Sequence, residues 1–194
     1  MAQLVVSMVQ SVDGFVEGPG GTFIEPEWSS DLDGWTGDMS RRFDTLIYGR
    51  TAWTQMAEYW PAAETSGGLE PAMQRLARFM NRSRKVVFSH QPVDISQWEN
   101  TVQAPGDVRM TVSGLLAEAG RDRDVVVFAG AAMAQSAFAA GVVGELWLLT
   151  VPRLAGGGKR LFSHEGPSVD LERLEVRPMD TGAVLTRFAV GEVA

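Results

Sequence analysis

The sequence predicts an α/β fold with a mostly parallel sheet of about eight strands and an antiparallel pair of strands at its carboxyl-terminal end. Short apolar runs alternate with helical patterns through most of the chain. The last two apolar runs have no helical pattern between them, only turn residues at Pro178, Asp180 and Gly182. The 194 residues show no break in composition, so we expect one domain over residues 1–194.

The expected strands are short runs rich in aliphatic and β-branched residues and bounded by turn residues. They cover Leu4–Val9, Thr45–Tyr48, Lys85–Ser89, Thr101–Ala104, Val125–Ala129, Leu146–Val151, Leu171–Val176 and Ala183–Val190. The run Val125–Phe128 is apolar without alternation, so both faces of this strand need a cover. Helices on both faces of the sheet provide that cover, which gives a three-layer arrangement.

The expected helices carry apolar residues at intervals of three or four positions. They cover Leu32–Phe43, Ala52–Trp60, Met73–Met80, Val112–Ala119 and Ala131–Ala140. Pro71 fits the first turn of the third helix, where a missing N–H costs no hydrogen bond. The glycine-rich segments 18–21, 67–68 and 156–158 fall between these elements and are expected to be loops.

The composition argues against several classes of protein. The chain has no cysteine, which removes disulfides, thiolate metal sites and cysteine nucleophiles and suits a reducing cytoplasm. His90 and His164 stand far apart and outside any ligand-spaced motif, so we expect no metal. No stretch approaches about 20 apolar residues and no export signal is present, so we expect a cytoplasmic protein without a membrane partner. The net charge of −7 argues against a nucleic-acid partner.

The tripeptide Gly49-Arg50-Thr51 follows the second expected strand and opens the second expected helix. A helix N-terminus presents unpaired N–H groups in a positive field, which attracts phosphate. Gly49 allows close approach, and Arg50 and Thr51 add a cation and a hydroxyl. An ordinary strand-to-helix connection is the alternative, and the tripeptide alone does not decide between the two.

Six motifs follow one another along the chain. They are Ser11-Val12-Asp13-Gly14, Asp44–Thr51, Val86-Val87-Phe88-Ser89, Val127–Ala132, Glu145-Leu146-Trp147-Leu148 and Gly156–Phe162. In this order they resemble the dihydrofolate reductase superfamily, and more narrowly the branch related to the reductase domain of the bifunctional riboflavin-biosynthesis deaminase-reductase. The resemblance runs from Val5 to about Phe188 and implies a dihydrofolate-reductase-like fold.

The resemblance implies a site for NADPH across the carboxyl ends of the strands. The cofactor-binding positions that it implies here are Gly49, Arg50, Thr51, Ser89, His90, Gly130, Ala131, Ala132 and Met133. Ser89 and His90 would lie near the 2′-phosphate, and the two strand-to-helix turns would hold the pyrophosphate. Many relatives carry two successive glycines at the second turn, whereas Gly130 is followed here by Ala131. A tightly packed turn without a ligand is the alternative.

The resemblance also implies that the end of the first strand and the first helix flank a planar substrate. The implied substrate-binding positions are Gln10, Ser11, Asp13, Phe15, Trp28 and Trp35, with a glycine-rich lid at 18–21. Trp28 and Trp35 also suit a plain hydrophobic core. Phe15 stands where riboflavin-pathway reductases usually carry a basic residue, which argues against a phosphorylated substrate.

Asp33 is the candidate for the catalytic acid, because a hydride transfer also needs a proton. It precedes Gly49 by about the distance that separates the acid of folate reductases from the equivalent glycine. With Ser30 it also fits a capping arrangement, and an acidic residue in a first helical turn is favoured whatever the function.

We therefore expect an NADPH-dependent reductase of a pterin-like, pyrimidine-like or other planar heterocycle. The alternatives are the riboflavin-pathway 5-amino-6-(5-phosphoribosylamino)uracil reductase and a dinucleotide- or heterocycle-binding module without turnover. We also expect a homodimer with Leu146–Leu149 and Val184–Phe188 at its interface, because these strands would otherwise expose apolar groups. Cover of these strands within one chain is the alternative.

Overall fold

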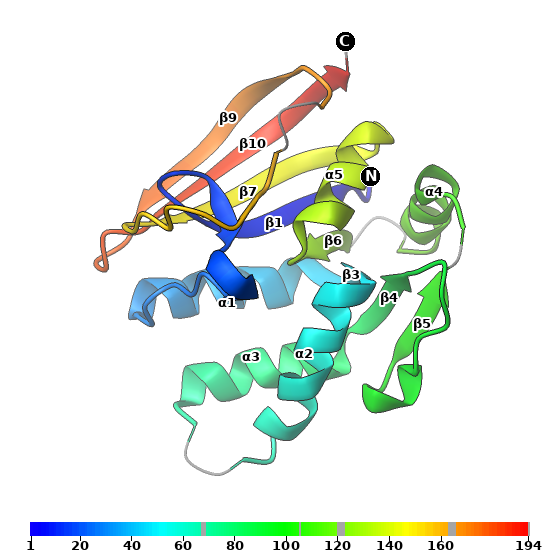
Figure 1. Cartoon of the computed structure of the whole chain (residues 1–194), viewed down its shortest axis with the longest axis horizontal. Helices are drawn as coiled ribbons and strands as arrows, with labels where there is room; N and C mark the ends of the chain where they lie inside the picture. Colours follow the sequence, from blue (N-terminus) through cyan, green and yellow to red (C-terminus); the bar gives the residue numbers. More distant parts are fainter. Residues whose placement is uncertain (67–68, 105, 120–122, 163–165, 194) are drawn as a thin grey trace.

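The computed structural model describes residues 1–66, 69–104, 106–119, 123–162 and 166–193, and its centre is a sheet between two layers of helices (Figure 1). The predicted loop at 67–68 and His164 lie outside the described residues. The sheet has the strand order β5-β4-β3-β6-β1-β7-β10-β9. Its strands are β1 (Leu4–Ser11), β3 (Phe43–Gly49), β4 (Arg84–Phe88), β5 (Thr101–Ala104), β6 (Asp124–Phe128), β7 (Val143–Val151), β9 (Val169–Pro178) and β10 (Val184–Val193).

The direction of the strands divides the sheet into two parts. The strands from β5 to β7 pair in parallel with their neighbours. In contrast, β10 is antiparallel to both β7 and β9. The mostly parallel sheet with an antiparallel carboxyl-terminal pair is therefore confirmed.

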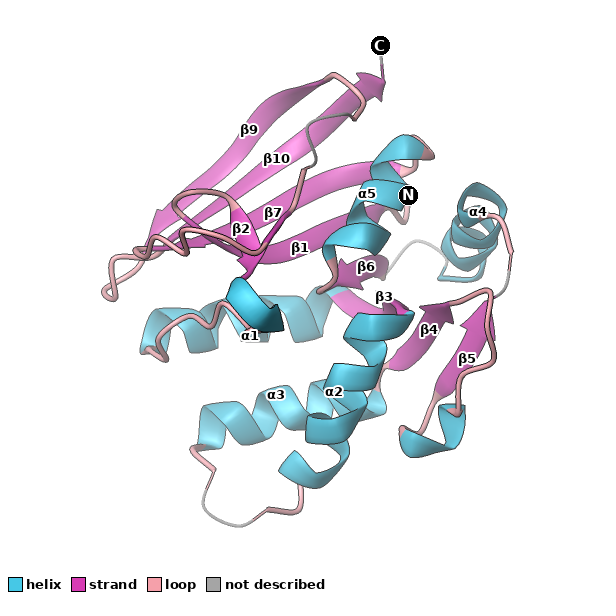
Figure 2. Ribbon diagram, viewed as in Figure 1, coloured by secondary structure: helices cyan, strands magenta, loops and turns pink. Residues whose placement is uncertain are grey.

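Helices cover both faces of the parallel part (Figure 2). The helices α1 (Ser30–Arg42), α2 (Arg50–Ala63) and α3 (Pro71–Arg82) pack on one face, and α4 (Val108–Ala119) and α5 (Ala131–Ala139) on the other. The neighbours Val5 and Val6 of β1 enter opposite core clusters, because successive side chains of a strand point to opposite faces. Among the described residues, no helix has the length and apolar character that crossing a membrane requires.

Four short elements that the sequence did not predict lie between the main strands and helices. The strands β2 (Phe15–Glu17) and β8 (Lys159–Arg160) form an antiparallel ribbon, and η1 (Pro19–Gly21) and η2 (Ile95–Gln97) are single turns of 3-10 helix. Two or three residues are too few to show a periodic pattern, so sequence reasoning missed these elements.

Helix α1 begins directly after Ser29. The hydroxyl of Ser29 accepts a hydrogen bond from the Leu32 N–H at 3.2 Å. Acidic residues in its first turn and the basic pair Arg41 and Arg42 in its last turn complement the helix dipole. The capping residue is therefore Ser29, one position before the Ser30 that the sequence suggested.

Trp147 of β7 faces α1 and not the surface. It is 2% exposed, and its ring lies edge-on to Phe43 with the centroids 5.4 Å apart. The guanidinium groups of Arg42 and Arg187 lie 5.2 and 4.5 Å from the same ring, and both pair with the buried Glu145. The expectation that Trp147 lies at a subunit interface is wrong, because this chain alone buries it.

Candidate cofactor and substrate site

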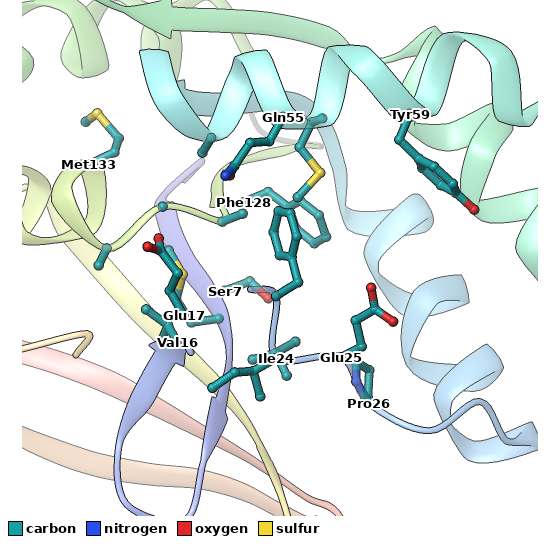
Figure 3. Close-up of a pocket in the computed structure, with 18 of the residues that line it drawn as sticks. Ser7, Val16, Glu17, Ile24, Glu25, Pro26, Gln55, Tyr59, Phe128 and Met133 are labelled. Carbon is teal, nitrogen blue, oxygen red and sulfur yellow. The ribbon is translucent and has the colours of Figure 1, made fainter. Parts of the chain in front are cut away.

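A cavity of about 570 Å³ opens toward the carboxyl ends of β1, β3 and β6 (Figure 3). Although β3 and β6 are neighbours in the sheet, α2 leaves β3 onto one face and α5 leaves β6 onto the other. The chain thus departs in opposite directions from two adjacent strands. Open α/β sheets bind their ligands in the crevice at such a point.

Two strand-to-helix turns form one wall of the cavity and touch each other. A Cβ added to Gly130 would lie 3.0 Å from the Cβ of Ala52, and one added to Gly49 would lie 3.7 Å from the Cβ of Met133. Gly130 has φ +92°, a backbone conformation that other residues rarely adopt, and Ala129 before it has φ +65°. The first turns of α2 and α5 therefore lie close together, and a side chain at position 130 would have a strained backbone and would crowd Ala52.

The N-termini of α2 and α5 carry no side-chain cap, so their first N–H groups stay available for a ligand. The cavity lining includes all the cofactor positions expected at these two turns, namely Gly49, Arg50, Thr51, Gly130, Ala131, Ala132 and Met133. Ala131 is 2% exposed, so its extra methyl group is packed inside the protein. Two convergent helix N-termini and one arginine suit a dianionic pyrophosphate, and these residues fit a nicotinamide dinucleotide.

The expected positions Ser89 and His90 do not line the cavity, but Arg50 connects them to it. The Arg50 guanidinium donates a hydrogen bond to Gln91 Oε1. The Ser89 hydroxyl accepts from the Gln91 N–H at 3.2 Å and donates to the Gln91 carbonyl at 2.7 Å, which closes a turn with His90 exposed in its middle. Sequence reasoning missed Gln91, because the resemblance points only to the two residues before it.

The other end of the cavity is apolar and aromatic. The expected Trp28 and Trp35 both line it. The remaining apolar lining comes from α1, α2, α3 and the segment before α1: Leu32, Met56, Tyr59, Trp60, Met73, Leu76, Phe23, Ile24 and Pro26. Figure 3 shows Gln55 and Tyr59 on α2 across the space from Ile24, Glu25 and Pro26. Such a lining suits a flat ring.

Three of the expected substrate positions lie outside the cavity lining and contact other parts of the chain. The Gln10 amide donates to the Thr150 hydroxyl at 3.2 Å. The hydroxyl of the buried Ser11 accepts from the Phe15 N–H at 3.1 Å. The Phe15 ring lies 4.3 Å from the Arg160 guanidinium, across the ribbon of β2 and β8. Gln10 therefore contacts β7, and Ser11 and Phe15 hold the turn after β1 and the ribbon of β2 and β8.

Asp13, the fourth such position, also lies outside the lining and fastens the loop after β7. Its carboxylate accepts from the N–H groups of Ala155 and Gly156 at 2.9 and 2.8 Å. The side chain of Ser11 and these two N–H groups lower the pKa of Asp13 from 3.8 to about 2. An ionised carboxylate thus holds the glycine-rich loop against the turn between β1 and β2.

Asp33 lies in a neighbouring groove and not in the lining of the cavity. Its carboxylate pairs with Arg75 of α3 at 2.5 Å, and the two side chains are 32% and 56% exposed. Thr36 and Leu76 line both the groove and the cavity and form the boundary between them. The structure therefore does not bring Asp33 together with the residues expected to hold the cofactor.

The polar lining combines the expected Trp35 with Ser7, Glu17 and Glu25, which sequence reasoning missed. Ser7 Oγ on β1 and Trp35 Nε1 on α1 are buried and have no hydrogen-bond partner among the described residues. Ser7 lies in a run of five buried residues, so no alternation marks its side chain as facing a ligand. Glu17 and Glu25 also line the cavity, from segments without a motif. Within the described residues, no cluster of three histidine or acidic side chains could hold a metal ion.

Comparisons with known proteins agree with this geometry. The sequence profile of the RibD C-terminal domain matches residues 2–185. The uncharacterised protein YyaP of Bacillus subtilis is 25% identical over 184 residues, which are 94% of this chain and 92% of that protein. A structure from Shewanella sp. PV-4, assigned to riboflavin biosynthesis, has a TM-score of 0.72 at 15% identity and covers 99% of this chain and 100% of its own.

The dihydrofolate-reductase-like fold is also confirmed. Dihydrofolate reductase from Enterococcus faecalis, in complex with NADP(H), has a TM-score of 0.58 at 14% identity. The similarity covers 98% of this chain and 97% of that one.

Proposed function

The chain belongs to the RibD C-terminal domain family, and we propose that it is an NADPH-dependent oxidoreductase that reduces a planar heterocyclic small molecule, pterin-like or pyrimidine-like. One observation carries the proposal: two uncapped helix N-termini meet at Gly49 and Gly130 beside an aromatic cavity. The first feature suits phosphates and the second suits a flat ring. A single cavity contains both.

The residues that would hold NADPH follow from this arrangement. The two turns, Gly49–Thr51 and Gly130–Met133, would bind the pyrophosphate. Arg50 and the turn at Ser89–Gln91 would bind the 2′-phosphate through charge-assisted hydrogen bonds. When bound, the cofactor supplies a hydride.

The chain itself must orient the substrate, keep water out and provide a proton. Reduction of a C=N or C=O bond places a hydride on carbon and a proton on nitrogen or oxygen. The carboxylates in the cavity lining are Glu17 and Glu25. Asp33 can act as the acid only if its pair with Arg75 opens.

A second candidate is the riboflavin-pathway reduction of 5-amino-6-(5-phosphoribosylamino)uracil. The family membership and the Shewanella structure favour it. Phe15 and the apolar lining between α1, α2 and α3 argue against it, because neither offers a partner for the substrate phosphate.

Calorimetry with NADPH and NADH at one salt concentration checks the cofactor assignment. We expect NADPH to bind about tenfold more tightly or better, and Arg50→Ala to remove most of that preference. Arg109→Ala, an exposed arginine on α4, is the matched control and should leave the preference unchanged. Equal binding of both dinucleotides would refute the 2′-phosphate assignment, and no oxidation of NADPH with any pterin or pyrimidine would refute the reductase.

The proposal also covers the domain organisation, the oligomeric state and the cellular location of the protein. We propose that residues 1–194 act as one domain, since the main sheet takes strands from both ends of the chain. We also propose a homodimer and a location in the cytoplasm, as the resemblance and the cysteine-free composition suggest.

A further inference from the structure

We propose that the aromatic end of the cavity selects an uncharged, largely apolar substrate and that hydrogen-bond acceptors of this substrate pair with Ser7 and Trp35. This inference rests on the proposed function, because it assigns the dinucleotide to the wall formed by the two helix N-termini. It adds what the other end of the cavity recognises.

The first support is the pair of unpartnered donors. Ser7 Oγ is in a residue 2% exposed, Trp35 Nε1 is in one 4% exposed, and both residues line the cavity. Buried polar groups in proteins nearly always have a partner, so each such atom needs an explanation. Tyr48, Trp147 and Arg187 also carry a buried unpartnered atom but lie outside the lining, whereas a ligand in the cavity is a possible partner for Ser7 and Trp35. An indole N–H only donates, and a hydroxyl donates or accepts. An acceptor such as a carbonyl oxygen or a ring nitrogen is the kind of ligand atom that suits either group.

The second support is the chemistry of the surrounding lining. This end is lined by two aromatic rings, two aliphatic side chains and two thioethers, from Trp28, Trp60, Leu32, Leu76, Met56 and Met73. Methionine side chains adapt to irregular apolar shapes, and aromatic rings stack on flat ones. A substrate that fills this space must therefore present mostly apolar surface.

The third support is the distribution of charge. The cations of the lining are Arg50, at the start of α2, and Lys159, on the ribbon strand β8. The carboxylate of Glu25, across the cavity from Tyr59, would repel a phosphate (Figure 3). Arg75, on α3, lies outside the lining and pairs with Asp33. A phosphate group on the substrate therefore has no cationic partner at the aromatic end, and its removal from water would cost free energy. An uncharged ring avoids this cost.

A matched series of planar probes tests the inference: lumichrome, riboflavin and riboflavin 5′-phosphate. Lumichrome is an uncharged ring with carbonyl acceptors, and the last two differ only in the phosphate. Binding to the protein saturated with NADP⁺ is followed by calorimetry and by quenching of tryptophan fluorescence. We expect lumichrome to bind, and riboflavin 5′-phosphate to bind about tenfold more weakly than riboflavin or worse.

Two variants test the anchor. Ser7→Ala and Trp35→Phe should each weaken lumichrome binding by about fivefold to tenfold, because each removes one hydrogen bond. Trp147→Phe removes an indole N–H that is also buried and unpartnered but belongs to a residue outside the cavity lining, so as the matched control it should leave lumichrome binding unchanged. Circular dichroism melting of each variant checks that it is folded.

The possible failures are distinguishable. No binding of lumichrome, equal binding of riboflavin and its phosphate, or unchanged binding in both anchor variants would each overturn this inference. NADP⁺ affinity, measured alone in the same variants, should stay at the parent value. If the parent protein does not bind NADP⁺ at all, the proposed function is overturned instead.

Discussion

Two features of Gly130 disfavour a side chain at this position, its backbone conformation and its closeness to Ala52. Its φ of +92° disfavours any side chain, and an added Cβ would lie 3.0 Å from Ala52. Gly130→Ala should therefore lower the free energy of unfolding by about 1–3 kcal/mol and weaken NADPH binding, because the first turns of α2 and α5 must move apart. Urea unfolding and calorimetry measure the two effects.

Gly34→Ala is the control for that change. Gly34 lies inside α1, and a Cβ built on it meets nothing within 4 Å. We expect this variant to be more stable by about 0.5–1 kcal/mol, since alanine is the better helix former. A loss of stability equal to that of Gly130→Ala would contradict the steric argument.

Asp33 has two interpretations, as the catalytic proton donor and as a structural acid in the first turn of α1. The ion pair with Arg75 and the position outside the cavity lining favour the structural one. We therefore expect Asp33→Asn to keep turnover within a factor of about three and to lower the melting temperature by no more than about 4 °C. Steady-state kinetics decide the matter. A fall in turnover of about 100-fold, with cofactor binding intact, would restore Asp33 as the proton donor.

At the scale of elements, Lys85 of β4 ties the end of α3 to the sheet. Its buried ammonium group donates to the carbonyls of Met80 and Asn81 at 3.1 and 2.8 Å and lies 4.6 Å from the Trp98 ring. Burial lowers the pKa of Lys85 from 10.5 to about 8. Between these two pH values the unfolded chain binds more protons than the folded one, so stability should rise with pH.

Urea unfolding from pH 7.5 to 10 measures this rise. Lys85→Met should abolish it, whereas Lys159→Met, which removes an exposed lysine, should not. Burial also raises the pKa of Tyr48 well above 10, so stability should fall above about pH 10 in the parent and in both variants. If the free energy of unfolding still rises with pH in Lys85→Met, another titrating group causes the rise.

The elements show where sequence reasoning succeeds and where it stops. Runs such as Val125–Phe128 and the turn at Gly49 are local, so their patterns predict the parallel sheet and the helix that follows. The ribbon of β2 and β8 depends on pairing between Phe15 and Arg160, which no local pattern reveals. The same holds for Ser7, since only its neighbours in space distinguish it from the other buried residues of β1.

At the scale of the whole molecule, the outer strand β9 leaves apolar side chains in solvent. Leu171, Leu174 and Val176 are 44–51% exposed. Cover by a second copy would bury them, and an interface of about 1,600 Å² is ordinary for a stable pair of subunits. We expect light scattering to give twice the 21.1 kDa of one chain.

Val176→Glu should convert that dimer to a monomer, because it places a charge in the proposed interface. Met110→Glu changes an apolar residue on α4 that is 77% exposed, and the dimer should persist in it. A parent protein with the mass of one chain would contradict the dimer. If the Val176→Glu variant is still a dimer, the interface does not lie at β9.

The contact between the first turns of α2 and α5 has a consequence for how the protein responds to its ligand. These helices lie in different layers, on opposite faces of the sheet. A pyrophosphate bound by both turns would cross-link the two layers, so the gain in stability should be shared between them and not stay local. At a cofactor concentration of about 100 times Kd that gain is about 2.7 kcal/mol. Amide hydrogen exchange should then slow on both faces of the sheet at once, in α2 and in α5.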